Sequence, residues 1–231
     1  MNPARLSPPL AALFPPGVIG AELGGAAEPS LLLPEEALAV RRARDARRRE
    51  FAAGRLCARR ALAELGYADF PLRTGADRRP LWPAQVIGSI SHTRGACAAV
   101  VAPRRRYCAI GLDMEVVGSV TPDIWPIVCT AAESDWLSAL PESAQALHAA
   151  LIFSAKEAFY KCQFGLTGRW LDFQDVALDP DASAPGTGRF VLQPAAGGPH
   201  YHGAFVVRDG VIAAGVAMGA HGRWHWSGGE S

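Results

Sequence analysis

Apolar runs along the chain predict strands in two regions. VIGSIS, ACAAVVA and CAIGLDMEVV lie between residues 86 and 117, and the turn His92-Thr93-Arg94-Gly95 separates the first two. Beyond residue 170, the segments LDFQDVAL, GRFVLQP and AFVVRDGVIAAGVAMG show the same kind of pattern. The dipeptide Asp209-Gly210 lies between apolar runs in the last of them and predicts a β-hairpin.

The first predicted helix begins at Pro34 and continues to Gly66. Proline suits the first turn of a helix, and the acidic residues Glu35 and Glu36 suit the positive end of the helix dipole. Apolar residues recur at helical spacing in its second half, which predicts one buried face. Gly54 is a candidate position for a break or kink, because glycine has a low helix propensity.

Two further helices are predicted between the strand regions. Thr130 and Glu133 form a capping-box pattern that opens a short helix. A longer helix is expected from about Ala144 to Cys162. Each half of the chain then contains a helix and antiparallel strands, so the predicted fold class is α+β.

Length and composition fit one sizeable core or two small fused ones, because the chain has 231 residues and 49% of them are hydrophobic. The basic loop before Tyr107 marks the expected boundary between an N-terminal half, residues 1–107, and a C-terminal half, residues 108–231. The formal net charge of +1 requires neither a nucleic acid nor a membrane as a partner. We expect the tail after Trp226 to be frayed.

The sequence predicts a soluble, cytoplasmic protein. The N-terminal segment MNPARLSPPLAALFPPG lacks the pattern of a signal peptide, and the apolar runs are shorter than a membrane span. The five cysteines form no CxxC pair, which argues against a disulfide framework or a zinc site. Unpaired cysteines are typical of a reducing compartment.

The segment IGLDMEVV places two carboxylates side by side. Because side chains alternate along a strand, Asp113 and Glu115 lie on one face with Gly111, opposite an apolar face. Two neighbouring carboxylates repel each other unless a positive charge lies between them, and Mg²⁺ prefers such oxygen ligands. The alternative is a half-buried strand whose outer face is acidic.

The segment FSAKEAFYK, residues 153–161, contains the second charged group. Glu157 and Lys161 are four residues apart and share a helix face, with Lys156 beside them. The plainer interpretation is a surface ion pair, which stabilises a helix by only about 0.2–0.5 kcal/mol. The functional interpretation is a carboxylate that binds a metal or takes a proton, with lysines that bind phosphate oxygens.

A row of arginines and one histidine complete the candidate groups. Arg41, Arg48 and Arg55 are spaced by seven residues, so they fall near one face of the predicted helix. Such a row binds a polyanion or forms a solvated helix face, and nucleic-acid binding is a third interpretation. The basic run is short and has no interleaved aromatic residues, which argues against nucleic acid. His92 lies at a strand end, although a lone histidine is more often structural.

Together these groups predict a phosphate-rich ligand and attack at phosphorus. Paired carboxylates suit a divalent metal, and lysines and arginines suit phosphate oxygens. The chain contains no P-loop, GxGxxG, GxSxG or HExxH motif.

IGLDME and, about 40 residues later, FSAKEAFYK resemble the signature of the 4′-phosphopantetheinyl transferase superfamily, (I/V)G(I/V/L)DxE and (F/W)SxKEAxxK. GRLCARRAL, RRPLWP, GSISHT and LTGRWLDF extend the resemblance from about Arg47 to Val176. They are similar to the enterobactin-type branch of the large, monomeric, surfactin-type enzymes. The resemblance implies two similar α/β halves related by a pseudo-twofold axis, with coenzyme A in the cleft between them.

The resemblance also implies a role for each candidate residue. Asp113, Glu115 and Glu157 would bind Mg²⁺, or Mn²⁺, and Glu157 would also be the general base. Lys156 and Lys161 would bind phosphate and neutralise charge on the leaving group. The further residues that would bind coenzyme A are Arg48, Arg55, Arg78, Arg79, Ser91 and His92. The sequence leaves open the choice of Arg48 over Arg47 and Arg49, and the choice between Arg78 and Arg79.

The activity implied by the resemblance is transfer of the phosphopantetheine arm to a serine of an acyl or peptidyl carrier protein. A monomer is expected, with neither nucleic acid nor membrane as a partner. A non-catalytic coenzyme A-binding protein and a metal-dependent phosphohydrolase are the alternatives on the same fold.

Overall fold

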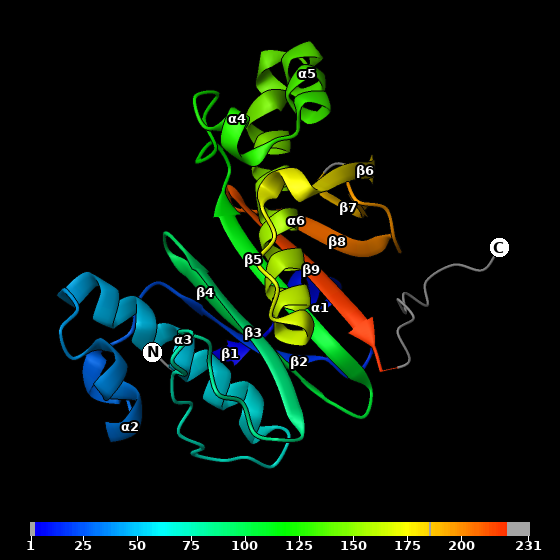
Figure 1. Ribbon diagram of the computed structural model, residues 1–231. Helices are drawn as coiled ribbons and strands as arrows, with labels where there is room; N and C mark the ends of the chain where they lie inside the picture. The colour runs from blue at the N-terminus through cyan, green and yellow to red at the C-terminus, as the bar shows by residue number, and fades with distance from the viewer. Residues whose placement is uncertain (1–2, 185, 221–231) are drawn as a thin grey trace.

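The computed structural model describes residues 3–184 and 186–220, which form two antiparallel sheets with one long helix on each (Figure 1). The α+β fold class is therefore confirmed. The first sheet contains, in spatial order, β1 (Ala4–Arg5), β2 (Ile19–Gly24), β4 (Ala96–Pro103) and β3 (Val86–Thr93). The second contains β5 (Tyr107–Val116), β9 (Val211–Gly219), β8 (Tyr201–Arg208), β7 (Thr187–Pro194) and β6 (Val176–Ala184).

Helices fill the connections between these strands. Within the described residues the α-helices are α1 (Pro8–Ala11), α2 (Pro34–Ala37), α3 (Asp45–Ala63), α4 (Trp125–Val128), α5 (Ala131–Ala139) and α6 (Glu142–Thr167). Short 3-10 turns are η1 (Pro29–Leu31), η2 (Leu38–Val40) and η3 (Phe173–Asp175). No helix in the described part of the chain is long and apolar enough to cross a membrane.

The helix predicted from Pro34 to Gly66 is two helices. It begins at Pro34 as expected, but α2 ends at Ala37 and α3 begins only at Asp45. The chain turns here because the carboxylate of Glu36, which is fully buried, forms an ion pair with Arg59 of α3. Gly54 was a candidate for a break or a kink; α3 continues through it, so there is no break, and a kink stays a prediction.

Helix α6 lies unusually close to β5, and a glycine makes this possible. A Cβ atom at Gly111 would overlap the backbone carbonyl oxygen of Ala158. Gly111 shares its strand face with Asp113 and Glu115, as the alternation predicted. The close packing therefore brings the backbone of α6 against the acidic face of β5.

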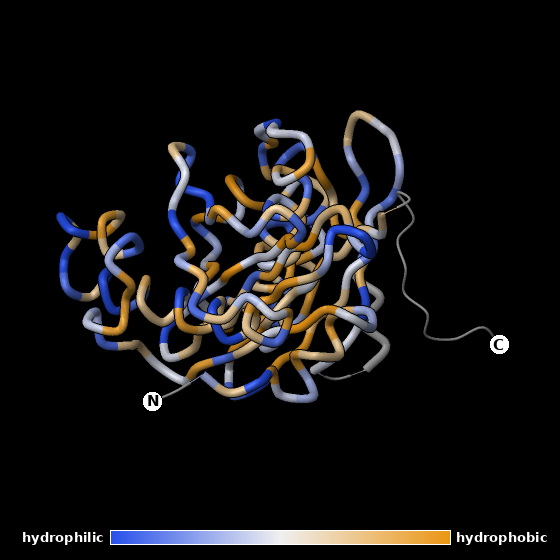
Figure 2. The backbone as a smooth tube through the Cα atoms, turned by 90° about the horizontal axis from the view of Figure 1, so that it is seen from below, coloured by the Kyte–Doolittle hydropathy of each residue, from blue (hydrophilic) through white to orange (hydrophobic). Residues whose placement is uncertain are grey.

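The two sheets meet at β3 and β5 and share a core. The backbone N–H groups of Leu112 and Met114 donate hydrogen bonds to the hydroxyls of Ser89 (3.0 Å) and Ser91 (3.2 Å). Because both pairs have the same separation along the chain, β3 and β5 run side by side in the same direction. Figure 2 shows the hydrophobic segments gathered in the middle of the molecule. The apolar face of β5 packs here against residues of β4, β8 and β9.

Several local predictions are confirmed and others corrected. Thr130 caps α5 in a capping box with Glu133, and Asp209 and Gly210 both have positive φ (51° and 74°), which suits the two-residue hairpin turn. Helix α6 continues beyond Cys162 to Thr167. Residues 171–175, predicted as strand, instead lead into η3, because the carboxylate of Asp175 accepts a hydrogen bond from the N–H of Asp172 (2.8 Å).

Strand β2, which pairs with β4 inside the first sheet, was not predicted from the sequence. The tail after Trp226 lies outside the described residues. The expected boundary at Tyr107 coincides with the start of β5, the first strand of the second sheet. The division into residues 1–107 and 108–231 stays a prediction.

Candidate active site

Asp113 is the most constrained carboxylate on the acidic face of β5. Its Oδ1 atom accepts hydrogen bonds from the ammonium of Lys161 (2.6 Å) and the hydroxyl of Ser91 (3.0 Å). Its Oδ2 atom is buried and has no hydrogen-bond partner among the described residues. Buried carboxylate oxygens are normally paired, so the unpaired Oδ2 atom is a candidate ligand for a cation.

Lys161 joins α6 to β3 and β5, the edge strands at which the two sheets meet. Besides Asp113, its ammonium donates to the backbone carbonyl of Leu112 (3.2 Å) and the hydroxyl of Ser91 (3.3 Å). The side chain remains 29% exposed and lines a cleft beside the acidic face. Lys161 is therefore positioned to bind both the acidic face of β5 and an anionic ligand.

Glu115 and Glu157 make the site more acidic than one lysine neutralises. Burial, with the neighbouring charge of Asp113, raises the pKa of Glu115 to about 7. Burial also raises the pKa of Glu157, while Lys161 opposes the shift and the charge of Asp113 adds to it. The three carboxylates therefore lie near enough for their charges to interact.

These carboxylates do not form a ready metal site. The Glu115 carboxylate accepts a hydrogen bond from the Ser119 hydroxyl (3.3 Å). Within residues 3–184 and 186–220, no three His, Cys, Asp or Glu side chains are grouped so that they could hold a metal ion. The free Asp113 Oδ2 and the excess negative charge nevertheless fit a divalent cation, which takes carboxylate oxygens as ligands.

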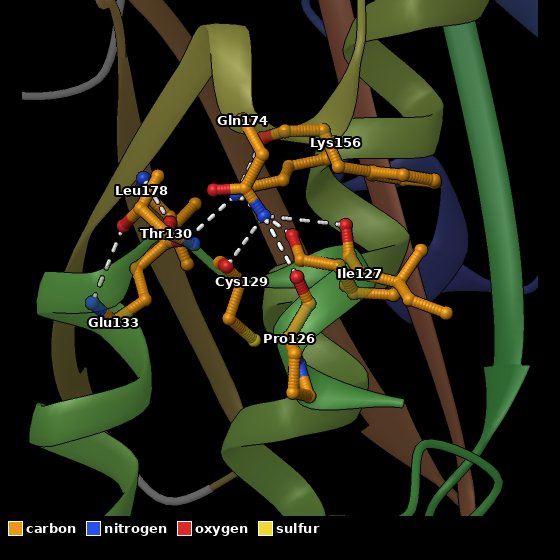
Figure 3. A network of polar contacts seen from close by, with 10 residues as sticks. Pro126, Ile127, Cys129, Thr130, Glu133, Lys156, Gln174 and Leu178 are labelled. Carbon is orange, nitrogen blue, oxygen red and sulfur yellow. Dashed lines mark hydrogen bonds and ion pairs between the residues drawn. The ribbon is translucent and has the colours of Figure 1, made fainter. Parts of the chain in front are cut away.

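The ammonium of Lys156 lies apart from the acidic face of β5, in contacts that the sequence did not predict, and its role in phosphate binding stays a prediction. Its side chain is only 1% exposed, and its ammonium donates to the carboxylate of Glu133 (2.6 Å) and the carbonyls of Val128 (3.0 Å) and Phe173 (2.9 Å) (Figure 3). Five residues separate Lys156 from Lys161, and at about 100° per residue they lie about 140° apart around the helix. Its three acceptors are all protein groups and its side chain is almost fully buried, whereas the side chain of Lys161 is 29% exposed.

A cleft of about 680 Å³ is bordered by β3, the start of β5 and the last turns of α6. Arg78, Arg79, Lys161, Tyr160 and Trp170 all line it. This volume is typical of pockets for small molecules, and the basic residues suit an anion.

Arg79 connects the loop before β3 to helix α6 at this cleft. Its guanidinium lies over the ring of Phe164, 4.9 Å from the ring centre, and donates to the Phe164 carbonyl (3.3 Å). Arg78 is exposed and has a positive φ of 66°. The sequence left open the choice between Arg78 and Arg79. Both line the cleft, and Arg79 is the one that contacts α6.

The other residues predicted to bind coenzyme A differ in burial: some are exposed and others are buried. Arg48, chosen from its spacing, is exposed, whereas Arg47 donates to the Nε2 atom of His92 (2.8 Å). Arg55 is buried and donates to the carbonyl of Leu72 (2.8 Å), and burial lowers its pKa to about 10.

Ser91 is buried, and its hydroxyl already contacts Asp113, Met114 and Lys161. It therefore positions the acidic site, whereas a direct contact with coenzyme A was predicted.

Two long-range contacts, one beside the site and one at its arginine row, were not specified by the sequence. The capping box identified Glu133, but nothing in its spacing showed that it pairs with Lys156 from another helix. The contact of Arg47 with His92 spans 45 residues, so helix periodicity alone did not select Arg47 over its neighbours. The position of His92 at the end of β3 is the signal that separates Arg47 from Arg48 and Arg49.

Comparison with known proteins gives the same assignment along nearly the whole chain. Residues 35–102 match the 4′-phosphopantetheinyl transferase N-terminal domain, and residues 109–214 match the 4′-phosphopantetheinyl transferase superfamily. The chain is 36% identical over 197 residues to 4′-phosphopantetheinyl transferase Svp of Streptomyces mobaraensis, covering 83% of this chain and 80% of that protein.

Two further relatives support this result. Identity is 35% over 219 residues with 4′-phosphopantetheinyl transferase Npt of Nocardia iowensis, covering 89% of this chain and 97% of that protein. It is 37% over 134 residues with enterobactin synthase component D of Escherichia coli K12, covering 57% of this chain and 62% of that protein. The chain belongs to the 4′-phosphopantetheinyl transferase superfamily.

Proposed function

We propose that this protein transfers the 4′-phosphopantetheine arm of coenzyme A to a serine of an acyl or peptidyl carrier protein and releases 3′,5′-ADP. The observation that carries the proposal is the buried Asp113, held by Lys161 through one oxygen while the other has no partner in the described chain. Glu115 and Glu157 lie near it, at the edge of a cleft with a basic lining.

Asp113, Glu115 and Glu157 would hold Mg²⁺, or Mn²⁺, with Glu115 turning from the hydroxyl of Ser119. When bound, the ion supplies positive charge that neutralises the oxygens of the coenzyme A pyrophosphate. A bound cation would account for three acidic side chains in one partly buried site. The Oδ2 atom of Asp113, which has no partner within the described residues, would be one of its ligands.

Glu157 acts as the general base. The oxygen of the carrier serine attacks the β-phosphorus of coenzyme A, and Glu157 takes the proton of the hydroxyl. The bond from that phosphorus to the bridging oxygen breaks, and 3′,5′-ADP leaves with the electron pair. Because burial raises the pKa of Glu157, its carboxylate is a stronger base than an ordinary glutamate.

Lys161 binds the pyrophosphate oxygens and neutralises the charge that develops on the leaving 3′,5′-ADP. Arg78 and Arg79 add positive charge along the cleft, and Arg47 or Arg48 with His92 binds the phosphate at the 3′ position. Arg55 and Ser91 support these groups from their buried positions. The apolar part of the arm lies against Tyr160 and Trp170, which line both the large cleft and a small cavity beside Glu157.

The proposal includes a cytoplasmic location and a monomeric state, with residues 1–107 and 108–231 as the two halves that enclose the ligand. A carrier domain is large compared with the cleft, so only its serine needs to reach Glu157. The remaining carrier surface would rest on the rim of the cleft. A monomer suffices for this arrangement, because every proposed group comes from one chain.

The experiment is the intact mass of an apo carrier domain after incubation with this protein, coenzyme A and magnesium. A gain of one phosphopantetheine, lost when EDTA is present, supports both transfer and metal use. A gain that persists with EDTA would support transfer and contradict the proposed use of a metal. Binding of coenzyme A without any gain on acyl and peptidyl carriers would point to a non-catalytic protein. Hydrolysis of coenzyme A without a carrier would point to a phosphohydrolase.

A further inference from the structure

The sequence contains two lysines, Lys156 and Lys161, and both lie on α6. Lys161 faces the acidic site, whereas the ammonium of Lys156 is buried on another side of the helix. A buried charge is costly unless it is paired and hydrogen-bonded. Lys156 also directly precedes the proposed base, Glu157. Its contacts therefore identify the segments of the chain that are held against α6 next to Glu157.

Three segments that are distant in the sequence meet at Lys156 (Figure 3). Helix α6 supplies the ammonium, the junction of α4 and α5 supplies the carbonyl of Val128 and the carboxylate of Glu133, and η3 supplies the carbonyl of Phe173. Glu133 also accepts hydrogen bonds from the N–H groups of Thr130 and Leu178, both at 2.7 Å. The ion pair of Lys156 and Glu133 thus joins α5, α6 and the start of β6, and both of its charged groups are fully hydrogen-bonded.

Gln174 fixes the same segment a second time. Its amide nitrogen donates to the carbonyl of Cys129 at 2.7 Å and lies 3.3 Å from the carbonyls of Pro126 and Ile127. Figure 3 shows Gln174 reaching toward these carbonyls beside Lys156. The short segment that contains Phe173 and Gln174 is therefore held by two neighbouring side-chain anchors, one charged and one neutral.

This segment forms a wall of the cavity beside the proposed base. A cavity of about 70 Å³ is lined by Lys156, Glu157 and Tyr160 from α6 and by residues 170–173, among others. The ring of Phe173 also packs on Phe153 of α6, with ring centres 5.5 Å apart. The hydrogen bond from Lys156 to the Phe173 carbonyl fixes how far this wall lies from α6.

We propose that Lys156 is a positioning residue that, with Glu133, holds the 170–173 segment in place to receive the apolar arm of coenzyme A. The inference rests on the proposed function, because that function places the arm beside Tyr160 and Trp170. A wall fixed in advance spares the ligand the cost of ordering it. Loss of the anchor therefore weakens binding of the arm, while the phosphate-binding residues keep their positions.

The test compares two ligands that differ by the arm. Coenzyme A and 3′,5′-ADP share the adenosine and its phosphates, but only coenzyme A carries the phosphopantetheine. Calorimetric dissociation constants for both are measured with the wild-type protein, Lys156→Met and Glu133→Gln. We expect both variants to bind coenzyme A about tenfold more weakly and to bind 3′,5′-ADP as the wild type does, because only the arm meets the loosened wall.

Leu62→Ala is the control for lost stability. Leu62 is fully buried in the core of α3 and the first sheet, away from the 170–173 segment. It should lower the melting temperature without separating the two ligands. If Lys156→Met is too unstable to purify, Gln174→Ala removes the second anchor and gives the same comparison. Equal weakening of both ligands, or unchanged binding of both, would overturn the proposal.

Amine labelling read by mass spectrometry checks the geometry in the unaltered protein. Lys161 should react and become protected by coenzyme A, whereas Lys156 should be protected with or without it. Fast labelling of Lys156 would contradict the anchor. A wild-type protein that binds coenzyme A but modifies no carrier would overturn the proposed function and leave the ligand comparison intact, since that comparison needs only binding.

Discussion

Asp113 and Lys161 form a 2.6 Å ion pair between β5 and α6, although 48 residues separate them in the chain. The pair uses only one oxygen of Asp113 and leaves the other buried without a partner among the described residues. A purely structural ion pair would be expected to satisfy both oxygens. The relationship instead resembles one half of a binding site, in which the protein supplies a cation on one side and a ligand completes the other.

Ser91→Ala is expected to weaken metal-dependent activity, because the Ser91 hydroxyl donates to Asp113 Oδ1. The metal concentration needed for half-maximal transfer should rise by about tenfold, the scale of other changes to groups that orient metal ligands. Carrier modification measured at increasing magnesium concentrations gives this value.

Ser89→Ala is the matched control for this change. The Ser89 hydroxyl accepts a hydrogen bond from the N–H of Leu112, as that of Ser91 does from Met114, but no contact links it to Asp113. Both variants should lose about 1–3 kcal/mol of stability, since each leaves a buried N–H unpaired. Equal magnesium requirements in the two variants would show that Ser91 does not orient Asp113.

Gly111→Ala is expected to disturb the site through the backbone of α6. The new methyl group would overlap the carbonyl of Ala158, so the helix must shift away from β5. Such overpacking costs about 1–3 kcal/mol of stability, and the shift should separate Lys161 from Asp113 and lower activity. Denaturant unfolding and carrier modification measure the two effects.

Gly165→Ala, in α6, is expected to raise stability, whereas Gly111→Ala is expected to lower it. A Cβ there meets nothing within 4 Å, so the change should stabilise α6 by about 0.5–1 kcal/mol. If both glycine variants had the same stability, the close approach at Gly111 would not constrain the helix.

The affinity for divalent metal should increase as the pH rises through about 7. Burial and Asp113 raise the pKa of Glu115 to about 7, above the ordinary value of 4.5. In the absence of metal, the raised pKa means that Glu115 contributes most to the stability of the fold when the pH is below 4.5. This contribution is lost as the pH rises through about 7. A metal ion replaces the proton, so its binding strengthens over the same interval.

Magnesium titrations followed by calorimetry between about pH 6 and about pH 8 measure this dependence. Glu115→Gln should weaken binding and flatten its pH profile, because the titrating carboxyl group is gone. A wild-type affinity that does not change across this interval would contradict a role for Glu115 as a metal ligand.

Strand alternation predicted the acidic face of β5 correctly, because its period of two places Asp113 and Glu115 on one side whatever the rest of the fold does. The capping box of Thr130 and the Asp209-Gly210 turn were predictable for the same reason, since both depend on residues close in sequence. These features are local, and tertiary contacts did not override them.

The direction of Lys156 was not predictable from the motif alone. Its motif placed it next to Glu157, but about 100° per residue turns adjacent side chains to different faces of a helix. Its partner Glu133 is 23 residues away, on another helix. The break between α2 and α3 has a similar origin, because the buried Glu36 turns the chain toward Arg59. Both outcomes depend on pairs that the spacing of residues does not specify.

The most direct test of the account is to measure the modified carrier and 3′,5′-ADP in the same reaction, with the wild-type protein and with Asp113→Asn. The account predicts one molecule of 3′,5′-ADP for each phosphopantetheine added by the wild type. For the variant it predicts a rate lower by about 100-fold or more, because the side chain keeps its shape and loses the charge. A variant that transferred at the wild-type rate with magnesium would contradict the assignment of Asp113 as the centre of the site.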